Sequence, residues 1–511
     1  MEKKESLLEK LIRYGESDFY PFHMPGHKRR DISSLPSGAD RIDGKGEFPN
    51  PYSIDITEIA GFDNLHHAEG ILKESMETAA RIYGADHTYY LVNGSSCGIL
   101  AAICGCTKRG GKILIARNCH KSSYHSLILN QLEPVYLYPA YLERYGINGG
   151  IGAEDVKKEL EAGGIEVVLV VSPTYEGIVS DIRAIANAAH AHGVPLIVDE
   201  AHGAHFPFAA SGFPRPALEC GADVVIQSLH KTLPSFTQTA VLHTRGNLAN
   251  RTEIERYLGI FQSSSPSYLF MASIERCILF MDGPGRAEMD RYRDRLLRFY
   301  EKTKDLKFLD ILNPAICREH SVYDWDMSKI VISTGKICSV SQNGENGRRI
   351  FGGEWLSRVL REQYHLEMEM EAPEYVIAMT SLMDTEEGLH RLADALKKID
   401  RDLEEQTVGA GLNSDSRERE SITSALPEPE IVMKISEALE KKAMKMPFSE
   451  SIGRISREFV YLYPPGIPVL APGERIKKDV FDVIMWYRDM GMSVQGIADP
   501  ALSSIITVAD E

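Results

Sequence analysis

The chain has 511 residues, more than one hydrophobic core usually organises, so two or three domains are expected. Its 57 basic and 73 acidic side chains give a formal charge of -16, which argues against a nucleic-acid partner because phosphate would be repelled. No stretch reaches the roughly 18 apolar residues of a membrane span, and the charged N-terminus lacks a signal-peptide core. A cytoplasmic protein without a membrane partner is therefore expected.

An amphipathic helix is predicted within residues 1–17, and residues 89–238 then alternate short apolar runs with helical patterns. Several runs are unbroken and β-branched, as in parallel strands covered on both faces. A helix is predicted at 181–193, where Gly193 has the place of a C-cap. This alternation indicates a doubly wound α/β domain with a mainly parallel sheet, which binds ligands at the carboxyl ends of its strands. The predicted strands are 89–92, 112–116, 134–139, 167–172, 195–200 and 224–228.

The rest of the chain shows a mostly helical bridge at 268–306 and a second alternating region at 308–403. Strands are predicted there at 329–333 and 374–380, with a helix at 352–365. A polar stretch rich in Gly, Ser and Pro is typical of a linker. The expected divisions are an N-terminal arm (1–50), a cofactor-binding large domain (51–290), a small α/β domain (291–405), a linker (406–430) and a C-terminal α+β domain (431–511).

The eight cysteines are scattered along the chain. Neither a CxxC pair nor a Cys/His spacing typical of a metal site occurs. Reduced thiols are therefore expected, and no metal site is.

Lys231 directly follows the predicted strand 224–228. A lysine at the carboxyl end of a strand is placed where a ligand would bind, and a sheltered amine is partly deprotonated, as a Schiff base requires. Ser228 and His230 flank it and can donate to an anionic phosphate. A single lysine is ordinarily a surface residue, so the functional interpretation depends on three further features.

The segment Asn93-Gly94-Ser95-Ser96 follows the first predicted strand and opens a helix. Gly94 lets the backbone approach a ligand closely, and the helix N-terminus presents free N–H groups and a positive dipole. The hydroxyls of Ser95 and Ser96 add donors, which predicts a phosphate-binding cup. A serine-rich helix cap without a ligand has the same pattern.

Asp199 lies at the end of the predicted strand 195–200, and a buried carboxylate there needs a cationic partner. The protonated pyridine nitrogen of pyridoxal phosphate is such a partner, and the pairing keeps the ring an electron sink. Residues 199–202, Asp-Glu-Ala-His, also match the magnesium-binding box of helicase ATPases. That alternative requires an upstream G-x-x-x-x-G-K-[ST] loop, which the sequence lacks.

His120 follows the predicted strand 112–116, and its flat imidazole can stack on a cofactor ring. Alone, it would be interpreted as a structural histidine. Along the chain the order is phosphate cup, stacking histidine, strand-end carboxylate and lysine, and each follows its own strand. Together these features indicate a pyridoxal-phosphate enzyme in which Lys231 binds the cofactor.

A pyridoxal-phosphate attachment signature is matched by SLHKTLPSFTQTA at 228–240. Further matching segments are FHMPGHK (22–28), GADHTYYLVNGSSCG (84–98), RNCHKS (117–122), VVSPTYEG (170–177), VDEAHGAH (198–205) and YPPGIPVLAPGE (463–474). On these segments the chain resembles the Orn/Lys/Arg decarboxylases over nearly its whole length. The resemblance implies the aspartate-aminotransferase-type fold, known as fold type I, with a smaller α/β domain and a C-terminal α+β domain.

The resemblance also implies a role for each matching residue. Lys231 would form the Schiff base, Asp199 would pair with the pyridine nitrogen, and His120 would stack on the ring. The residues implied to hold the phosphate are Ser95, Ser96, Ser228 and His230. His202 would lie beside the ring near its phenolic oxygen, although some large members have tryptophan there and the exact contact stays open.

Assembly follows from the same resemblance. Ser264, in the segment 263–266, would reach the cofactor of a partner subunit. Large bacterial members begin with a receiver-like wing domain, whereas this chain starts almost directly at 22–28, so it resembles the short form. A homodimer or homotetramer with shared active sites is expected rather than a decamer. The Leu233-Pro234 step departs from a family segment that is often rich in Gly or Ala.

The implied reaction is decarboxylation of a basic amino acid to its amine and carbon dioxide, in polyamine synthesis or acid resistance. Arginine is preferred over lysine and ornithine, because short-form members are often arginine decarboxylases. In the family a glutamate within 366–375 faces the distal cation of the substrate; Glu369 fits best, with Glu371 next. Exposed carboxylates at a strand edge are the alternative interpretation.

Two other functions remain open at this point. One is another reaction of the same fold, such as that of an aminotransferase or a lyase, although no arginine clamp for a second carboxylate can be placed. The other is a cofactor-binding regulator without turnover. The presence of Lys231, Asp199 and His120 argues against the regulator.

Overall fold

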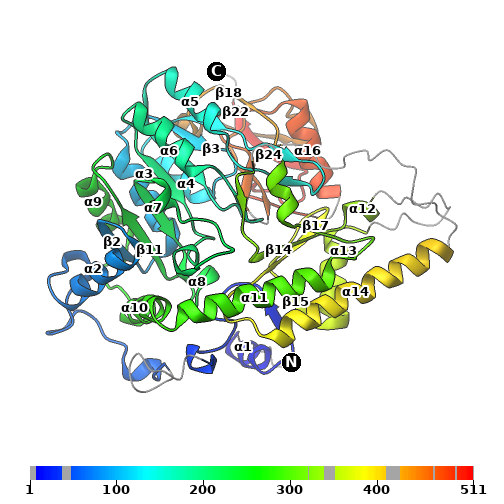
Figure 1. Ribbon diagram of the computed structural model, residues 1–511. Helices are drawn as coiled ribbons and strands as arrows, with labels where there is room; N and C mark the ends of the chain where they lie inside the picture. The colour runs from blue at the N-terminus through cyan, green and yellow to red at the C-terminus, as the bar shows by residue number, and fades with distance from the viewer. Residues whose placement is uncertain are drawn as a thin grey trace, which may run out of the picture.

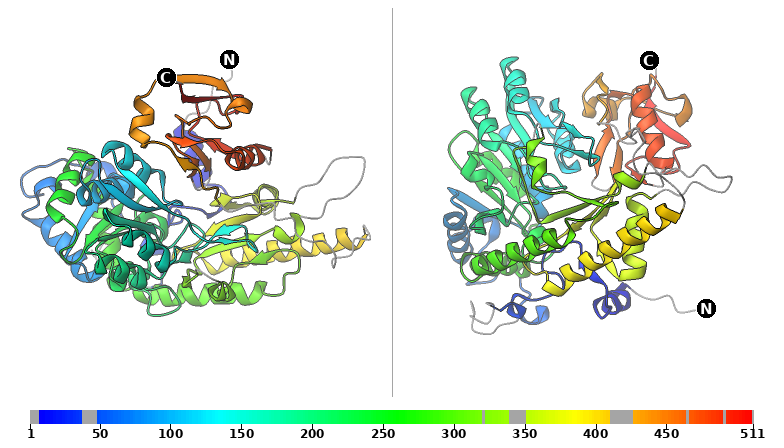
Figure 2. Two further views of the ribbon diagram at one scale, coloured as in Figure 1. Left: turned by 90° about the horizontal axis from the view of Figure 1, so that it is seen from above. Right: turned by 45° about the vertical axis from the view of Figure 1, so that its right-hand side comes forward.

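The computed structural model describes residues 7–36, 48–319, 322–338, 351–409, 426–463, 466–489 and 492–509. The chain forms a large domain around a seven-stranded sheet, a small domain around a four-stranded sheet, and a C-terminal unit of short strands and helices (Figure 1). Figure 2 shows the C-terminal unit, in orange and red, standing out from the other two. The mixed α/β architecture predicted from the sequence is confirmed.

The large sheet follows the predicted apolar runs. In order across the sheet, its strands are β2 (His87–Leu91), β11 (Ala240–Thr244), β10 (Val224–Gln227), β9 (Leu196–Asp199), β7 (Ile165–Val171), β3 (Lys112–Ala116) and β4 (Glu133–Leu137). From β10 to β4 all neighbours pair in parallel, and their apolar runs are unbroken because helices cover both faces. Strand β11, which the sequence analysis did not identify, runs antiparallel to both neighbours.

Helices of the large domain surround this sheet, some packed directly on it and others on a neighbouring helix. They are α2 (Ile71–Tyr83), α3 (Gly94–Cys106), α4 (Lys121–Leu129), α5 (Ala153–Glu161), α6 (Ile182–Ala191), α7 (Ala217–Cys220), α8 (Leu229–Thr232), α9 (Arg251–Phe261) and α10 (Tyr268–Asp282). Helix α3 is apolar on all sides because it lies between the sheet and α9 within one buried cluster. A Cβ at Gly105 would lie 2.7 Å from Ile254, so glycine is what permits this close helix contact.

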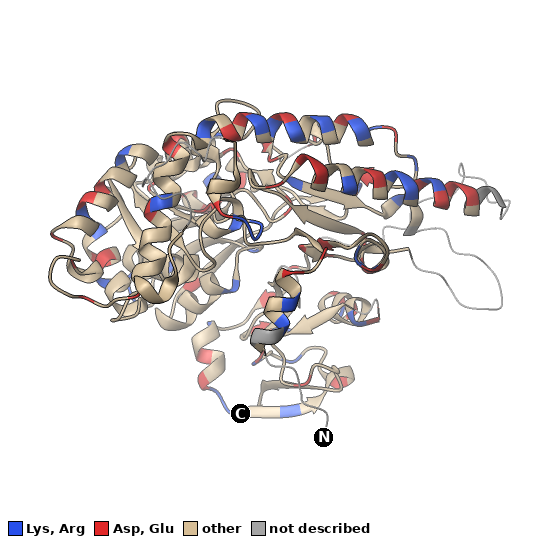
Figure 3. Ribbon diagram, turned by 90° about the horizontal axis from the view of Figure 1, so that it is seen from below, with Lys and Arg blue, Asp and Glu red and all other residues tan. Residues whose placement is uncertain are grey.

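The small domain is built on an antiparallel sheet with the order β12 (Asp310–Ile311), β14 (Lys329–Ser333), β17 (Tyr375–Met379) and β16 (Met370–Glu371). Its helices are α11 (Gly285–Thr303), α12 (Gly335–Cys338), α13 (Gly353–Tyr364) and α14 (Glu386–Gly409). Basic and acidic residues alternate along α11 and α14 in Figure 3, as expected for helices with one face in solvent. The predicted strands and helix of this region are all present.

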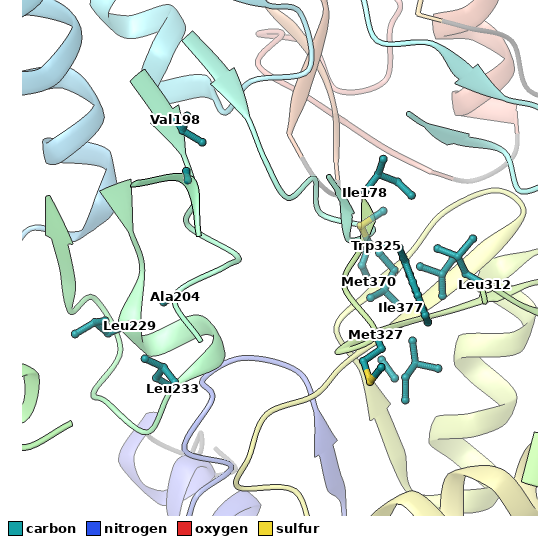
Figure 4. Close-up of a cluster of buried hydrophobic side chains, with 14 of the residues drawn as sticks. Ile178, Val198, Ala204, Leu229, Leu233, Leu312, Trp325, Met327, Met370 and Ile377 are labelled. Carbon is teal, nitrogen blue, oxygen red and sulfur yellow. The ribbon is translucent and has the colours of Figure 1, made fainter. Parts of the chain in front are cut away.

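One hydrophobic core extends from the large domain into the small domain. In Figure 4, Ile178, Trp325 and Met370 lie together on the small-domain side, while Leu229 and Leu233 lie beside the ends of the large-sheet strands. Strand β8 (Ile178–Val179) pairs with β13 (Asp324–Trp325) and so joins the two domains through the backbone. The shared core holds the two domains in a fixed relation.

The N-terminal arm contributes to the small domain. After α1 (Leu7–Gly15), strand β1 (Tyr20–Phe22) pairs in parallel with β15 (Leu366–Met368). Further along the arm, both carboxylate oxygens of Asp31 accept hydrogen bonds from Arg276 of α10, at 2.9 and 3.0 Å. The arm therefore connects the small and large domains.

The C-terminal unit begins with a short strand. Its elements are β18 (Glu430–Ile431), α15 (Ile435–Glu440), β19 (Ala443–Pro447), β20 (Val460–Tyr463), β21 (Ile467–Leu470), β22 (Glu474–Arg475), α16 (Lys478–Asp489), β23 (Ser493–Gln495) and β24 (Ser504–Val508). Helix α14 continues to Gly409, inside the predicted linker, whose residues 410–425 lie outside the described residues. The domain boundaries stay predictions. Within the described part of the chain, every helix is too short or too polar to cross a membrane.

A buried ion pair attaches the C-terminal unit to the large domain. Arg117 follows β3 and is fully buried, as is Glu474 of β22. The two form a bidentate pair with N–O distances of 2.6 and 2.9 Å, and Arg117 also donates to the carbonyl of Val469 at 3.2 Å. The guanidinium lies 4.6 Å from the centre of the Tyr136 ring. Because each charge is buried, each depends on the other for compensation.

We expect Glu474→Leu to lower the free energy of unfolding by about 3–5 kcal/mol, because Arg117 is then left buried without a counter-charge. Adding Arg117→Met should restore much of that loss, since apolar side chains replace a buried ion pair at little cost. Chemical denaturation followed by circular dichroism measures both effects. The control is Glu133→Leu in the half-exposed Lys112–Glu133 pair, which should cost at most about 1 kcal/mol. Equal losses at Glu474 and Glu133 would contradict this assignment.

Candidate functional site

A cavity of about 230 Å³ lies at the carboxyl ends of the large-sheet strands. The position is expected for a parallel sheet, because the loops after several strands converge at one edge. Its walls come from the large domain and, through Ile467 of β21, from the C-terminal unit. The lining residues used below are Ser95, Ser96, Asn118, His120, Asn148, Tyr175, Glu176, Asp199, His202, His230, Lys231 and Ile467.

Lys231 projects into this cavity from the short helix α8, which follows β10. Its Nζ lies 2.9 Å from Nε2 of His202. Burial lowers the pKa of the Lys231 amine, while the charges of Asp199 and Glu369 oppose that shift. The amine is therefore closer to its neutral, nucleophilic form than an exposed lysine.

His202 is a neutral ring at the centre of the site. Burial drives its pKa well below the usual range, and the positive charge of Lys231 adds to the shift. Nε2 of the ring shares a hydrogen bond with Nζ of Lys231. Its Nδ1 is buried and has no hydrogen-bond partner among the described residues. The ring lies 4.6 Å from the Tyr175 ring, tilted by 55°.

Lys329 of β14 holds the backbone of His202 in place. Its buried Nζ donates to the His202 carbonyl at 2.9 Å, to Asp326 at 2.7 Å and to the Ser328 hydroxyl at 2.8 Å. Burial lowers the pKa of Lys329, and Asp326 opposes that shift. This contact ties the small domain to the cavity. The role of Lys329 was not predicted, since a lysine at the start of a strand shows no signal of it.

Asp199 is the last residue of β9, and its carboxylate is buried at the cavity. Burial raises its pKa, while the Lys231 charge and the N–H of Ala201, at 3.1 Å, lower it. A cation facing Asp199 would complete its compensation. The predicted strand-end carboxylate thus lies on the same cavity as the predicted lysine.

The predicted phosphate cup is the start of α3. Asn93 makes no side-chain cap, so the first N–H groups of α3 stay available, and Gly94 has the positive φ of 77°. Ser95 and Ser96 line the cavity, and the buried Ser228 donates to the Ser95 hydroxyl at 2.9 Å. The serine hydroxyls and the free N–H groups converge on one wall.

The other two predicted histidines on the cavity wall are also neutral. His120 caps α4, and its Nδ1 accepts from the backbone N–H of Ser122, so its proton is on Nε2. Burial lowers the pKa of His120 to about 3 and that of His230 to about 4. Nδ1 of His230 donates to the carbonyl of Thr239 at 2.9 Å, which leaves its Nε2 as an acceptor. His230 must therefore be protonated to donate to a phosphate.

Four predicted residues lie off the cavity wall. Ser228 is buried and reaches the wall only through its hydrogen bond to Ser95. Ser264 is exposed on the loop after α9 and is not a lining residue of its own subunit's cavity. Glu369 is partly buried behind the wall; it accepts from Tyr175 at 2.5 Å and from the backbone N–H of Met24 at 2.7 Å. Glu371 lies two residues further on, in β16, and also does not line the cavity.

Several lining residues carried no role in the sequence analysis. Tyr175 and Glu176 follow β7, so inspection of the residues after every strand would have found them. Asn118 follows β3 and could have been found in the same way. Asn148 and Ile467 lie far from the sheet in sequence and show no such signal.

Comparison with known proteins shows the family that the chain matches. The profile of the Orn/Lys/Arg decarboxylase major domain matches residues 6–333, and the profile of the C-terminal domain of these enzymes matches residues 418–497. An arginine decarboxylase of Bacillus anthracis is 29% identical over 99% of this chain and 97% of its own length. An arginine decarboxylase of Bacillus subtilis (strain 168) is 30% identical over 96% of this chain and 95% of its own.

A solved structure supports the fold assignment. The lysine decarboxylase LdcF of Francisella novicida has a TM-score of 0.74 at 22% identity, covering 98% of this chain and 80% of that chain. The same architecture, the profile matches and the residues gathered around Lys231 agree with the resemblance predicted from the motifs. The chain belongs to the Orn/Lys/Arg decarboxylase family.

Proposed function

We propose that this chain is a pyridoxal-phosphate-dependent decarboxylase of a basic amino acid, with arginine preferred over lysine and ornithine. The observation that carries the proposal is the buried lysine at the strand ends, facing a buried carboxylate and a neutral histidine in one cavity. The preference for arginine is supported by the relatives from Bacillus anthracis and Bacillus subtilis, which are named arginine decarboxylases.

The cavity fits pyridoxal phosphate in the chemistry of its groups. Nδ1 of His202 and Oδ1 of Asn118 are buried at the wall and lack partners among the described residues, so a ligand can satisfy both. The carboxylate of Asp199 needs a cation, and the uncapped start of α3 suits an anion. The unpaired atoms of His202 and Asn118 suit the polar substituents of the cofactor ring. Asp199 suits its pyridine nitrogen, and the start of α3 suits its phosphate.

Each residue has a proposed contact. Lys231 would hold the cofactor covalently, Asp199 would pair with the pyridine nitrogen, His120 would stack on the ring, and His202 would lie beside the phenolic oxygen. Those proposed to hold the phosphate are Ser95, Ser96, Ser228 and His230, the last in the protonated form that a nearby phosphate charge favours. When bound, the cofactor supplies an electron sink for the pair left behind by carbon dioxide.

The protein's own contribution is desolvation and proton placement. Ile99, Val171 and Ile467 make part of the cavity wall apolar, which disfavours a charged carboxylate and favours its loss. Burial lowers the pKa of Lys231, which favours the neutral, nucleophilic form of its amine. Because Nζ of Lys231 lies 2.9 Å from His202, the two can pass the proton that replaces the carboxylate.

Substrate contacts and assembly complete the proposal. Glu369, with Glu371 next to it, is the sequence-based candidate for the distal cation of the substrate. Shared active sites in a homodimer or homotetramer would use Ser264, which is exposed and so free to meet a partner subunit. The cytoplasmic location predicted from the sequence is part of the same proposal.

The proposed reaction predicts carbon dioxide and amine from at least one basic amino acid. Purified protein with pyridoxal phosphate should release both, most rapidly from arginine, because an apolar site with an electron sink favours loss of the carboxylate. Release of labelled carbon dioxide and chromatography of the amine measure the reaction. A keto-acid product would point to an aminotransferase instead. No release of carbon dioxide from arginine, lysine or ornithine would refute decarboxylation.

Lys231→Ala should abolish both the visible absorbance of the bound cofactor and turnover, because the covalent attachment needs the Nζ. Absorbance spectra and the carbon dioxide assay report the two losses separately. Lys336→Ala, at a largely exposed lysine of α12, is the control and should change neither. Survival of the visible band in Lys231→Ala would show that another lysine binds the cofactor.

Glu369→Gln should move the pH profile of cofactor uptake to lower pH. The negative charge of Glu369 raises the pKa of Lys231, so removing it lowers that pKa and leaves more neutral amine at any given pH. The rate at which visible absorbance appears after mixing apoprotein with pyridoxal phosphate measures the profile. Glu367→Gln, on the neighbouring strand β15, should leave it in place. A shift to higher pH would contradict this electrostatic assignment.

A further inference from the structure

Glu176 is a carboxylate on the cavity wall that the mechanism above does not use. It follows β7, is only 4% exposed and lines the same cavity as Lys231. The charges that shift the pKa of Lys231 belong to Asp199, Glu369 and Lys329. Burial instead raises the pKa of Glu176, while hydrogen bonds from Tyr375 and Thr174 oppose that shift. The Glu176 carboxylate is hydrogen-bonded to Tyr375, whereas the Lys231 amine is hydrogen-bonded to His202.

No lysine, arginine or histidine pairs with Glu176 among the side chains that the structure describes. Its Oε1 accepts from the hydroxyl of Tyr375 at 2.9 Å, and burial raises its pKa above the ordinary range. A carboxylate has lone pairs for about four hydrogen bonds, so this one keeps capacity for another donor. A buried carboxylate without a counter-charge is costly, and a cation entering the cavity would remove that cost.

The sequence-based candidates meet these conditions less well. Both oxygens of Glu369 already accept hydrogen bonds, and its charge already acts on Lys28 and Lys231. Glu371 does not line the cavity. Asp199 faces Lys231 and lies at the end proposed for the pyridine nitrogen. Glu176 is thus the lining carboxylate with an unmet need for positive charge.

The surroundings of Glu176 suit a long cationic side chain. Tyr141 of β5 (Tyr141–Leu142) contributes to the raised pKa of the Tyr375 hydroxyl. In the antiparallel strand pair, Tyr141 lies opposite Asn148 of β6 (Ile147–Asn148). Residues opposite each other in an antiparallel pair share a face, and Asn148 lines the same cavity as Glu176. The Asn148 amide oxygen can accept a hydrogen bond from a guanidinium or ammonium group. Ile467 adds an apolar wall for the methylene chain.

We propose that Glu176 binds the distal cationic group of the substrate and so determines the preference for a basic amino acid. The assignment rests on the proposed decarboxylase function, and it gives Glu176 the role that sequence analysis gave to Glu369. Asn148 supports the contact as a neutral acceptor, and Tyr375 orients the carboxylate through its hydroxyl.

The test compares holoenzyme of the wild type, Glu176→Gln and Glu369→Gln. Two quantities are measured: KM for arginine, and the inhibition constant of citrulline, which replaces the guanidinium by a neutral group of similar shape. In Glu176→Gln, KM for arginine should rise about 10- to 100-fold, because a charge-assisted hydrogen bond is lost, while kcat changes little. The constant for citrulline should stay close to the wild-type value.

Three controls make the result specific. Tyr375→Phe keeps the carboxylate charge and should raise KM less than Glu176→Gln does. Glu288→Gln removes a fully buried carboxylate of α11 outside the cavity and should leave KM unchanged. If Glu176→Gln does not fold, Glu176→Asp serves instead; its shorter side chain should raise KM for arginine but not the constant for citrulline. Cofactor absorbance and the melting temperature verify folding.

Several outcomes would overturn the proposal. An unchanged KM in Glu176→Gln, or in Glu176→Asp where it is the variant used, would do so. So would a loss of arginine preference confined to Glu369→Gln, which would give the contact to Glu369. A fall in kcat with KM unchanged would show a role in positioning. A wild type that releases no carbon dioxide from arginine, lysine or ornithine would refute the decarboxylase function itself, and this assignment with it.

Discussion

Desolvation of opposite charges at one edge of the large sheet is the constraint on which the site depends. Burial lowers the pKa of Lys231 and raises that of Asp199, and each charge partly offsets the shift of the other. Between them His202 is held neutral. The arrangement yields a nucleophilic amine and a carboxylate in need of a cation, which are the two properties that a pyridoxal site requires.

The rest of the fold supports this edge from two further directions. Lys329 of the small domain holds the carbonyl of His202 while paired with Asp326. The C-terminal unit adds Ile467 to the wall and is attached by the buried pair of Arg117 and Glu474. The cavity is therefore lined by the large domain and the C-terminal unit, while the small domain supports it from behind through Lys329.

Much of the architecture could be predicted, because unbroken apolar runs specify covered parallel strands and their carboxyl ends meet at one edge. That rule alone brings Ser95, His120, Asp199 and Lys231 to one cavity. It missed strand β11, whose run lies beyond the region assigned to alternating strands and helices. The position of Glu369 behind the wall also could not be predicted, since alternation along a strand does not tell which face meets the cavity.

By itself the sequence determined the family, the mainly parallel sheet and the order of the four features along the chain. These depend on local periodicity and on residues just after strands, which is information that short segments carry. Only the tertiary structure decided which groups are protonated and which buried charges are paired. It shows the neutral His202, the hydrogen bond from Lys329 to the His202 carbonyl, and the buried carboxylate of Glu176. Burial and counter-charges come from residues distant in sequence, so they exist only after the domains pack.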